Sequence, residues 1–193
     1  MNILSFDVES NGLHGAAFAV AGVLISPSCN ILSQFVARCP IVGEIDPWVA
    51  ENVLRPMGTI DNTHDNDKFM RDAFWSWYIQ TKPRAGIIVA ANPYPVEARF
   101  LIDCQNDDLA GRSVEHPFPF YDLSSMLYTL DVKTPPSRRA FTARAVSGLA
   151  GEPHNPQWDA LSTAISAQAA INLGISKVSA TAKILKVNRK ASV

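Results

Sequence analysis

The sequence is poor in cysteine: Cys29, Cys39 and Cys104 are the three in 193 residues, and no two of them form a CxxC pair. An odd and scattered set of this kind argues against a disulfide framework and against a zinc knuckle. Scarce, unpaired cysteine fits a reducing compartment, so we expect a cytoplasmic protein.

Long apolar runs and a basic leader are also lacking. The longest apolar candidate, residues 16–25, is too short to span a bilayer. The first five residues carry no basic side chain, and the acidic Asp7 and Glu9 interrupt the apolar residues near the N-terminus, so we expect no signal peptide. With 47% hydrophobic and 18% charged residues, the chain has enough apolar material for a core, and its length favours one domain.

Several catalytic signatures are missing as well. The sequence contains no glycine-rich phosphate loop, no GxSxG and no HExxH. Residues 1–175 carry 12 basic and 18 acidic side chains, a net charge of −6, whereas residues 176–193 carry five basic and no acidic ones. The acidic body argues against coating of long nucleic acid by electrostatics alone. The basic tail is either an arm for a polyanion or a solubilising end, and the sequence leaves both open.

The order of the apolar patterns predicts a mixed α/β domain. Residues 2–8, 18–25 and 31–37 have strand-like patterns joined by short turns, which predicts a three-stranded antiparallel meander. Residues 86–91 read as a buried strand and residues 118–121 as a short one. A helix is expected between them, from about residue 94 to residue 104.

Two further helices are predicted by spacing and by end signals. An apolar stripe at helical spacing is expected to pack on the sheet as part of the core. Its residues are Met70, Ala73, Phe74, Trp77 and Tyr78. The last helix has Asn155 as its N-cap, Pro156 at its first position and Gly174 as its stop.

Asp7 and Glu9 lie two residues apart at the end of the first predicted strand, so both side chains project from one face. Two carboxylates about 6–7 Å apart repel each other unless a cation lies between them. They either extend into solvent beyond the strand or hold a metal ion. The next turn, residues 10–13, contains a glycine that permits close approach of a ligand to the backbone.

Glu97 shares a predicted helix face with Phe100, Leu101 and Cys104. A carboxylate on a core-facing stripe costs free energy unless it is paired or bound to a metal. Glu97 is therefore a metal ligand, a partner of Arg99, or a cap at the start of its helix.

His154 and Asp159 flank the start of the last helix, with the imidazole on a loop and the carboxylate about one turn inside. A lone histidine at such a place is often structural. Together with the other acids, however, the pair forms a coherent set for phosphodiester hydrolysis. Mg²⁺ and Mn²⁺ prefer carboxylate oxygens, and two such ions neutralise the attacking and leaving oxygens. A histidine with a pKa near ~6.5 accepts a proton from the attacking water at neutral pH.

Three segments resemble the motifs of a known family. Residues 6–13 (FDVESNGL) resemble the first motif of the DEDD 3′–5′ exonucleases, usually written FDxETTGL. Residues 154–160 (HNPQWDA) match HxxxxDA, the third motif of the histidine-bearing DEDDh branch, which includes proofreading exonuclease subunits and oligoribonuclease. Residues 89–92 (VAAN), followed by Glu97, Phe100 and Leu101, resemble the second motif, VAHNxxFDxxFL. The resemblance covers roughly residues 2–173.

The resemblance implies a ribonuclease H-like α/β fold: a mixed five-stranded sheet, made of a three-strand antiparallel meander plus two parallel strands and flanked by helices. It implies a 3′–5′ exonuclease that releases nucleoside 5′-monophosphates from single-stranded nucleic acid by a two-metal mechanism. Residues 1–175 would form the exonuclease domain and residues 176–193 a basic C-terminal tail. Scarce basic residues slightly favour RNA over DNA as substrate.

Site residues are carried over from the matching motif positions. His154 is expected to be the general base, and Asn92 and the turn of residues 10–13 are expected to hold the terminal nucleotide, with Leu13 near its base. The expected ligands of two divalent ions, Mg²⁺ or Mn²⁺, are Asp7, Glu9, Glu97 and Asp159. The expected substrate-binding residues are Ser10, Asn11, Gly12, Leu13 and Asn92.

The second motif departs from the family pattern. Ala91 replaces the usual histidine, Pro93 and Pro95 flank Tyr94, and Glu97 stands about one residue away from the expected aspartate. A catalytically weak or inactive nucleic-acid-binding module on the same fold is therefore the alternative. A third hypothesis is a nuclease subunit that docks a larger complex through its tail.

Many members of the family are homodimers. An apolar region around residues 74–78 is a candidate for such an interface, although its helical spacing also fits the core.

Overall fold

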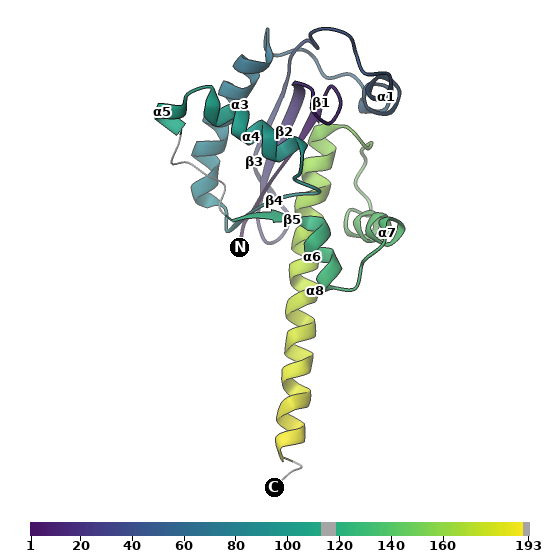
Figure 1. Cartoon of the computed structure of the whole chain (residues 1–193). Coiled ribbons are helices and arrows are strands. Elements are labelled where there is room, and N and C mark those ends of the chain that lie inside the picture. Colours follow the sequence, from purple (N-terminus) through teal and green to yellow (C-terminus); the bar gives the residue numbers. More distant parts are fainter. Residues whose placement is uncertain (113–118, 191–193) are drawn as a thin grey trace.

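A computed structural model describes residues 1–112 and 119–190, with the side chains of the last helix described as far as residue 176. Its centre is a five-stranded sheet in the order β3-β2-β1-β4-β5, with helices on both faces (Figure 1). The strands are β1 (Ile3–Ser10), β2 (Ala17–Ile25), β3 (Ile31–Arg38), β4 (Ile87–Ala90) and β5 (Phe120–Asp122). β1, β2 and β3 pair antiparallel, while β4 runs parallel to β1 and β5 parallel to β4. The predicted mixed sheet is confirmed; Phe118, which the prediction included in the last strand, lies outside the described residues.

Alternation along β1 divides the core into two layers. Leu4, Phe6 and Val8 belong to one buried cluster, which includes residues of α3 (Asp67–Thr81) and α4 (Val96–Asn106). Ile3 belongs to the other cluster, with residues of α8 (Pro156–Lys190). Successive side chains of a strand point to opposite faces, so Asp7 lies on the face that α8 covers.

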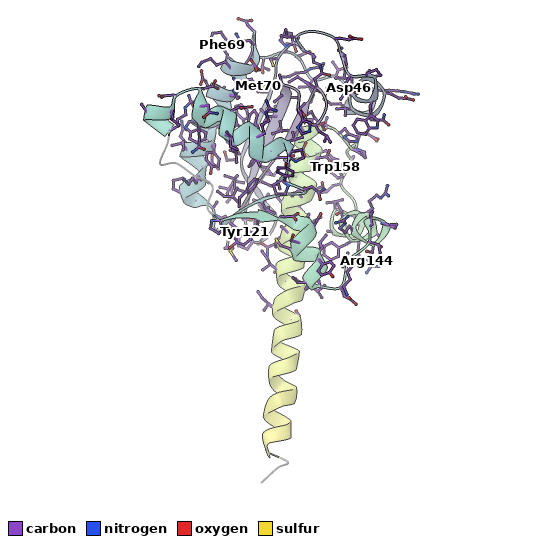
Figure 2. All side chains as sticks on the ribbon, in the orientation of Figure 1. Asp46, Phe69, Met70, Tyr121, Arg144 and Trp158 are labelled. Carbon is purple, nitrogen blue, oxygen red and sulfur yellow. The ribbon has the colours of Figure 1, made fainter. Side chains whose placement is uncertain are left out.

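The predicted stripe of α3 packs on the sheet as expected: Met70, Phe74 and Tyr78 are fully buried. Met70 is labelled in Figure 2. Gly22 on β2 leaves room for the ring of Trp77, because a Cβ there would collide with it. The indole Nε1 of Trp77 donates a 2.9 Å hydrogen bond to Ser33 Oγ on β3. The suggestion that this region forms a dimer interface is therefore wrong, since its aromatic side chains are packed inside one chain.

Shorter elements complete both faces. A segment made of α1 (Pro47–Val49), η1 (Ala50–Leu54) and α2 (Arg55–Met57) follows β3. η2 (Lys82–Arg84) leads into β4, and α5 (Leu109–Arg112) follows α4. Asp122 caps α6 (Leu123–Thr129) by accepting from Ser124 N–H. α7 (Pro135–Ala145) starts at a capping box formed by Thr134 and Ser137 and packs beside α8.

α8 starts where the sequence predicts. Asn155 Oδ1 accepts the backbone N–H groups of Gln157 and Trp158, and Pro156 is the first helical residue. The predicted stop at Gly174 is wrong, because the helix continues through it to Lys190. A glycine inside a helix costs only about 1 kcal/mol relative to alanine, and no proline follows it before residue 190.

The later turns of α8 extend away from the sheet (Figure 1). The basic side chains predicted for the tail lie outside the described side chains. Within the described chain, no helix combines the length and apolarity needed to cross a membrane.

Candidate active site

The carboxyl end of β1 carries the first two acids. Glu9 is 8% exposed, and Asp7 has a buried Oδ2 that meets no hydrogen-bond partner within the described residues. Their partners across the antiparallel pairing with β2 are Ala21 and Ala19, whose small side chains leave the space above the strand open. Both acids therefore lie under α8 rather than in solvent beyond the strand end.

Glu97 enters from the other side, on the first turn of α4. It is 8% exposed and shares its buried face with Phe100 and Leu101, as the spacing predicts. Backbone N–H groups of Glu97 itself and of Val8 hydrogen-bond its carboxylate. Arg99, the alternative ion-pair partner of Glu97, makes other contacts. It donates to the carbonyl of His14 at 3.0 Å and lies 3.6 Å from Asp103.

His154 and Asp159 close the site from the start of α8. The backbone N–H of His154 donates a 2.7 Å hydrogen bond to Asp159 Oδ2. The imidazole Nδ1 lies 3.5 Å from Glu9 Oε1. Ligand atoms of Glu9, His154 and Asp159 lie within 4.8 Å of one another, which is the spacing of a shared metal ion.

Burial raises the pKa of all four carboxyl groups, and repulsion from neighbouring carboxylates adds to this effect for Asp7, Glu9 and Glu97. Burial is the largest cause for Asp7, whose pKa lies well above its ordinary value, and Asp159, Glu97 and Glu9 add to it. Burial, followed by repulsion from Asp159 and Glu97, raises the pKa of Glu9 to about 8. Burial likewise raises the pKa of Glu97 to about 7 and that of Asp159 to about 6. Burial lowers the pKa of His154, which favours the neutral form of its imidazole.

A hard divalent cation fits this arrangement. Four crowded carboxylates ionise together only when positive charge compensates them. The buried Oδ2 of Asp7, without a partner among the described residues, is a further oxygen that a cation would satisfy. Carboxylate oxygens are the ligands that Mg²⁺ and Mn²⁺ prefer.

The turn after β1 is held by its own side chains. Ser10 Oγ donates to the carbonyl of Gly12 at 2.8 Å, and Gly12 has a φ of +80°. The Asn11 amide joins the turn to the backbone of residues 44 and 46. Leu13 is 64% exposed at its tip. The exposed part of the predicted nucleotide-binding turn is thus the Leu13 side chain.

Asn92 follows β4 and is tied to the start of α6. Its Oδ1 accepts a 2.7 Å hydrogen bond from Ser124 Oγ, and within the described residues it makes no hydrogen bond to the four carboxylates. The carboxylates and His154 thus come together, whereas Asn92 lies in a neighbouring network.

Sequence reasoning missed Trp48, which meets His154. The two ring centroids are 6.3 Å apart and the ring planes are perpendicular, at 89°. Trp48 is 60% exposed. The signal for its position is Asp46-Pro47, an N-cap followed by proline at the first helical position, which marks a helix start before an aromatic residue.

Comparisons with known proteins establish the fold. No family profile matches the sequence, and no curated protein matches it. Among solved structures, exonuclease X in complex with 5′-overhanging duplex DNA aligns with a TM-score of 0.55 and 16% identity, over 88% of this chain and 91% of that one. The 3′-exonuclease that recognises the histone mRNA stem-loop aligns with a TM-score of 0.57 and 15% identity, over 90% and 81%.

A third solved structure is the zinc-bound complex of E. coli ExoI with single-stranded DNA. It has a TM-score of 0.62 and 15% identity, over 86% of this chain. This chain spans only 39% of the ExoI chain. At these identities the likeness shows a fold, the α/β ribonuclease H-like fold that the sequence predicts.

Proposed function

We propose that this chain is a divalent-metal-dependent 3′–5′ exonuclease of the DEDDh type, which releases nucleoside 5′-monophosphates from single-stranded nucleic acid. The observation that carries the proposal is the convergence of four carboxylates and one histidine from β1, α4 and α8 at the end of β1. Solved exonuclease structures with a similar fold support it.

Asp7, Glu9, Glu97 and Asp159 would hold two Mg²⁺ or Mn²⁺ ions. Such ions neutralise the charge that develops on the attacking and leaving oxygens of a phosphodiester. The protein contributes a buried site from which bulk water is largely excluded, where electrostatic interactions are strong.

His154 would be the general base. Burial lowers its pKa and so favours the neutral imidazole, and its Nδ1 faces Glu9 Oε1 at 3.5 Å. That contact leaves Nε2 to accept the proton of the attacking water. The hydrogen bond from its backbone to Asp159 fixes the loop that carries the imidazole.

The substrate side is proposed from the rim of the site. Leu13 would contact the terminal base, and Ser10, Asn11, Gly12 and Asn92 would shape the pocket around the terminal nucleotide. The three similar structures are described with duplex DNA, single-stranded DNA and an mRNA stem-loop. The acidic body slightly favours short single-stranded RNA, because few basic residues are available for a long duplex.

Residues 1–175 would be the exonuclease domain, and residues 176–193 a basic tail that contacts a polyanion or a partner. Arg138, Arg139 and Arg144 on α7 add positive charge beside α8, and none of them forms an ion pair within the described part of the chain. A homodimer is proposed by analogy with the family. A cytoplasmic location is proposed because all three cysteines are free thiols.

The test uses 5′-labelled single-stranded RNA and DNA of equal sequence, with Mn²⁺ or EDTA. We expect a ladder that shortens from the 3′ end with Mn²⁺ only, and no ladder with Asp7→Ala. Asp61→Ala, at an exposed aspartate that is not one of the candidate site residues, is the matched control and should cleave like the wild type.

Each result decides between the two functions. Cleavage that persists in Asp7→Ala or in EDTA would contradict the metal mechanism. Binding of both oligonucleotides without cleavage would favour the non-catalytic binding module, with the displaced Glu97 as the cause. Faster cleavage of DNA than of RNA would overturn the proposed sugar preference.

A further inference from the structure

The 47–57 segment, made of α1, η1 and α2, lies beside the site and is anchored by its inner face. Val49, Val53 and Met57 are at most 3% exposed and belong to the cluster that contains Phe6. Burial of three apolar side chains keeps the segment on the core. Its two ends, by contrast, are held by polar contacts to residues next to the candidate ligands.

Asn11 holds the first end. Its Nδ2 donates to the carbonyl of Glu44, and its Oδ1 accepts the N–H of Asp46, both at 2.9 Å. The Asp46 carboxylate in turn accepts the N–H of Trp48 at 2.8 Å, as the cap of α1. The start of the segment is thereby tied to the turn that comes after Glu9.

Asn155 holds the second end. Its Nδ2 donates a 3.2 Å hydrogen bond to the carbonyl of Met57, while its Oδ1 caps α8. Figure 2 labels Asp46, next to α1, and Trp158, at the start of α8. A cavity of about 410 Å³ borders the contact, lined among others by Gly58, Asn155 and Trp158. The hydrogen bond from Asn155 is a polar restraint on this end of the segment, beside the burial of the Met57 side chain.

Trp48, which lies on this segment, contacts the candidate base. Its ring stands perpendicular to the His154 ring at 6.3 Å. His154 has a φ of +63°, a conformation that residues other than glycine adopt only where their surroundings enforce it. The Trp48 contact and the hydrogen bond to Asp159 are two such restraints.

We propose that Asn155 and Trp48 are positioning residues: Asn155 fixes the 47–57 segment, and Trp48 on that segment holds the His154 imidazole in its reactive orientation. The inference rests on the proposed function, in which His154 takes a proton. Displacement of a reacting group by about 1 Å can cost about 10²-fold in rate.

The first test is Asn155→Ser. Serine caps a helix as well as asparagine does, so α8 keeps its cap, while the N–H that reaches Met57 is removed. We expect kcat on a short oligonucleotide to fall about 10-fold to 100-fold, with KM within about twofold and an unchanged melting temperature. Asn66→Ser is the matched control, because Asn66 caps α3 by accepting the N–H of Phe69 at 3.0 Å; its kcat should equal that of the wild type.

Trp48→Ala should lower kcat to a similar extent, and Trp48→Phe should restore most of the loss because it keeps an aromatic ring. The double variant Asn155→Ser/Trp48→Ala should be no slower than either single variant, as two members of one restraint are not additive. An unchanged kcat in either single variant would overturn the proposal. A raised KM at constant kcat would overturn it too, since Trp48 would then be a substrate contact.

Hydrogen–deuterium exchange provides a readout that does not require turnover. Backbone amides of residues 47–57 should exchange faster in Asn155→Ser than in the wild type or in Asn66→Ser. Equal exchange in these three proteins would overturn the role of Asn155 in holding the 47–57 segment, even if the enzyme is active. If Asn155→Ser exchanges faster but the wild-type protein cleaves no oligonucleotide, the restraint by Asn155 is supported and the proposed function is contradicted.

Discussion

The backbone N–H of His154 donates a 2.7 Å hydrogen bond to the Oδ2 atom of Asp159. The carboxylate proposed as a metal ligand thus also fixes the loop of the candidate base. The same hydrogen bond opposes the effect of burial, which raises the pKa of Asp159 to about 6. Asp159 is therefore both a proposed metal ligand and a restraint on the loop of His154. Substitutions at these two residues should be compared for their effects on hydrolysis and on stability.

Asp159→Asn should lower hydrolysis by about 10³-fold or more, because metal ions supply several kcal/mol of transition-state stabilisation. The amide oxygen still accepts the His154 N–H, and one source of repulsion is removed. The metal-free variant should therefore melt at the same temperature as the wild type or slightly higher, as calorimetry would show. A collapse of the metal-free melting temperature would mean that Asp159 is mainly structural, and Asp61→Asn serves as the surface control.

His154→Ala and His154→Gly should both reduce kcat by about 10²–10⁴-fold, the range for loss of a general base. Their stabilities should differ, because His154 has a φ of +63°. Glycine adopts this conformation without the cost of a Cβ, so the glycine variant should be more stable by about 1 kcal/mol. Denaturant unfolding measures the difference, and an alanine variant as stable as the glycine variant would contradict it.

The stability of the metal-free protein should fall as pH rises from about 4.5 to 8. Burial raises the pKa of Glu9 from 4.5 to about 8 and that of Glu97 to about 7. In this range the folded protein binds more protons than the unfolded chain, so the free energy of unfolding decreases with pH. Melting curves in EDTA test this, and Glu9→Gln should flatten the dependence. A melting temperature that rises across the range would have the wrong sign.

Divalent ions should reverse that loss at pH 8. Mn²⁺ binds the folded carboxylates, and at 100 times its dissociation constant it adds about 2.7 kcal/mol to the free energy of unfolding. Wild-type protein should therefore melt at a higher temperature with Mn²⁺ than with EDTA, and Asp7→Asn should show a much smaller shift. Equal shifts in the two proteins would place the ion elsewhere.

Local patterns in the sequence predicted much of this molecule. The alternation in residues 2–8 predicted β1 and its two faces, and Asn155-Pro156 predicted where α8 begins. Glu97 was a candidate because a carboxylate on an apolar helix face needs compensation, and it is buried as that argument requires. These features depend on neighbours within a few residues, so sequence periodicity and capping chemistry suffice to find them.

Other features depend on contacts between distant segments. The pairing of Asn155 with Met57 joins residues 98 positions apart, and the contact of Trp48 with His154 joins α1 to the loop before α8. The stop predicted at Gly174 was wrong, because α8 continues through this residue to Lys190. A glycine allows a helix to end but does not force it to end. The sequence determined which residues are chemically suited to a metal centre; the tertiary structure decided their convergence, because burial and charge repulsion arise only when the segments pack together.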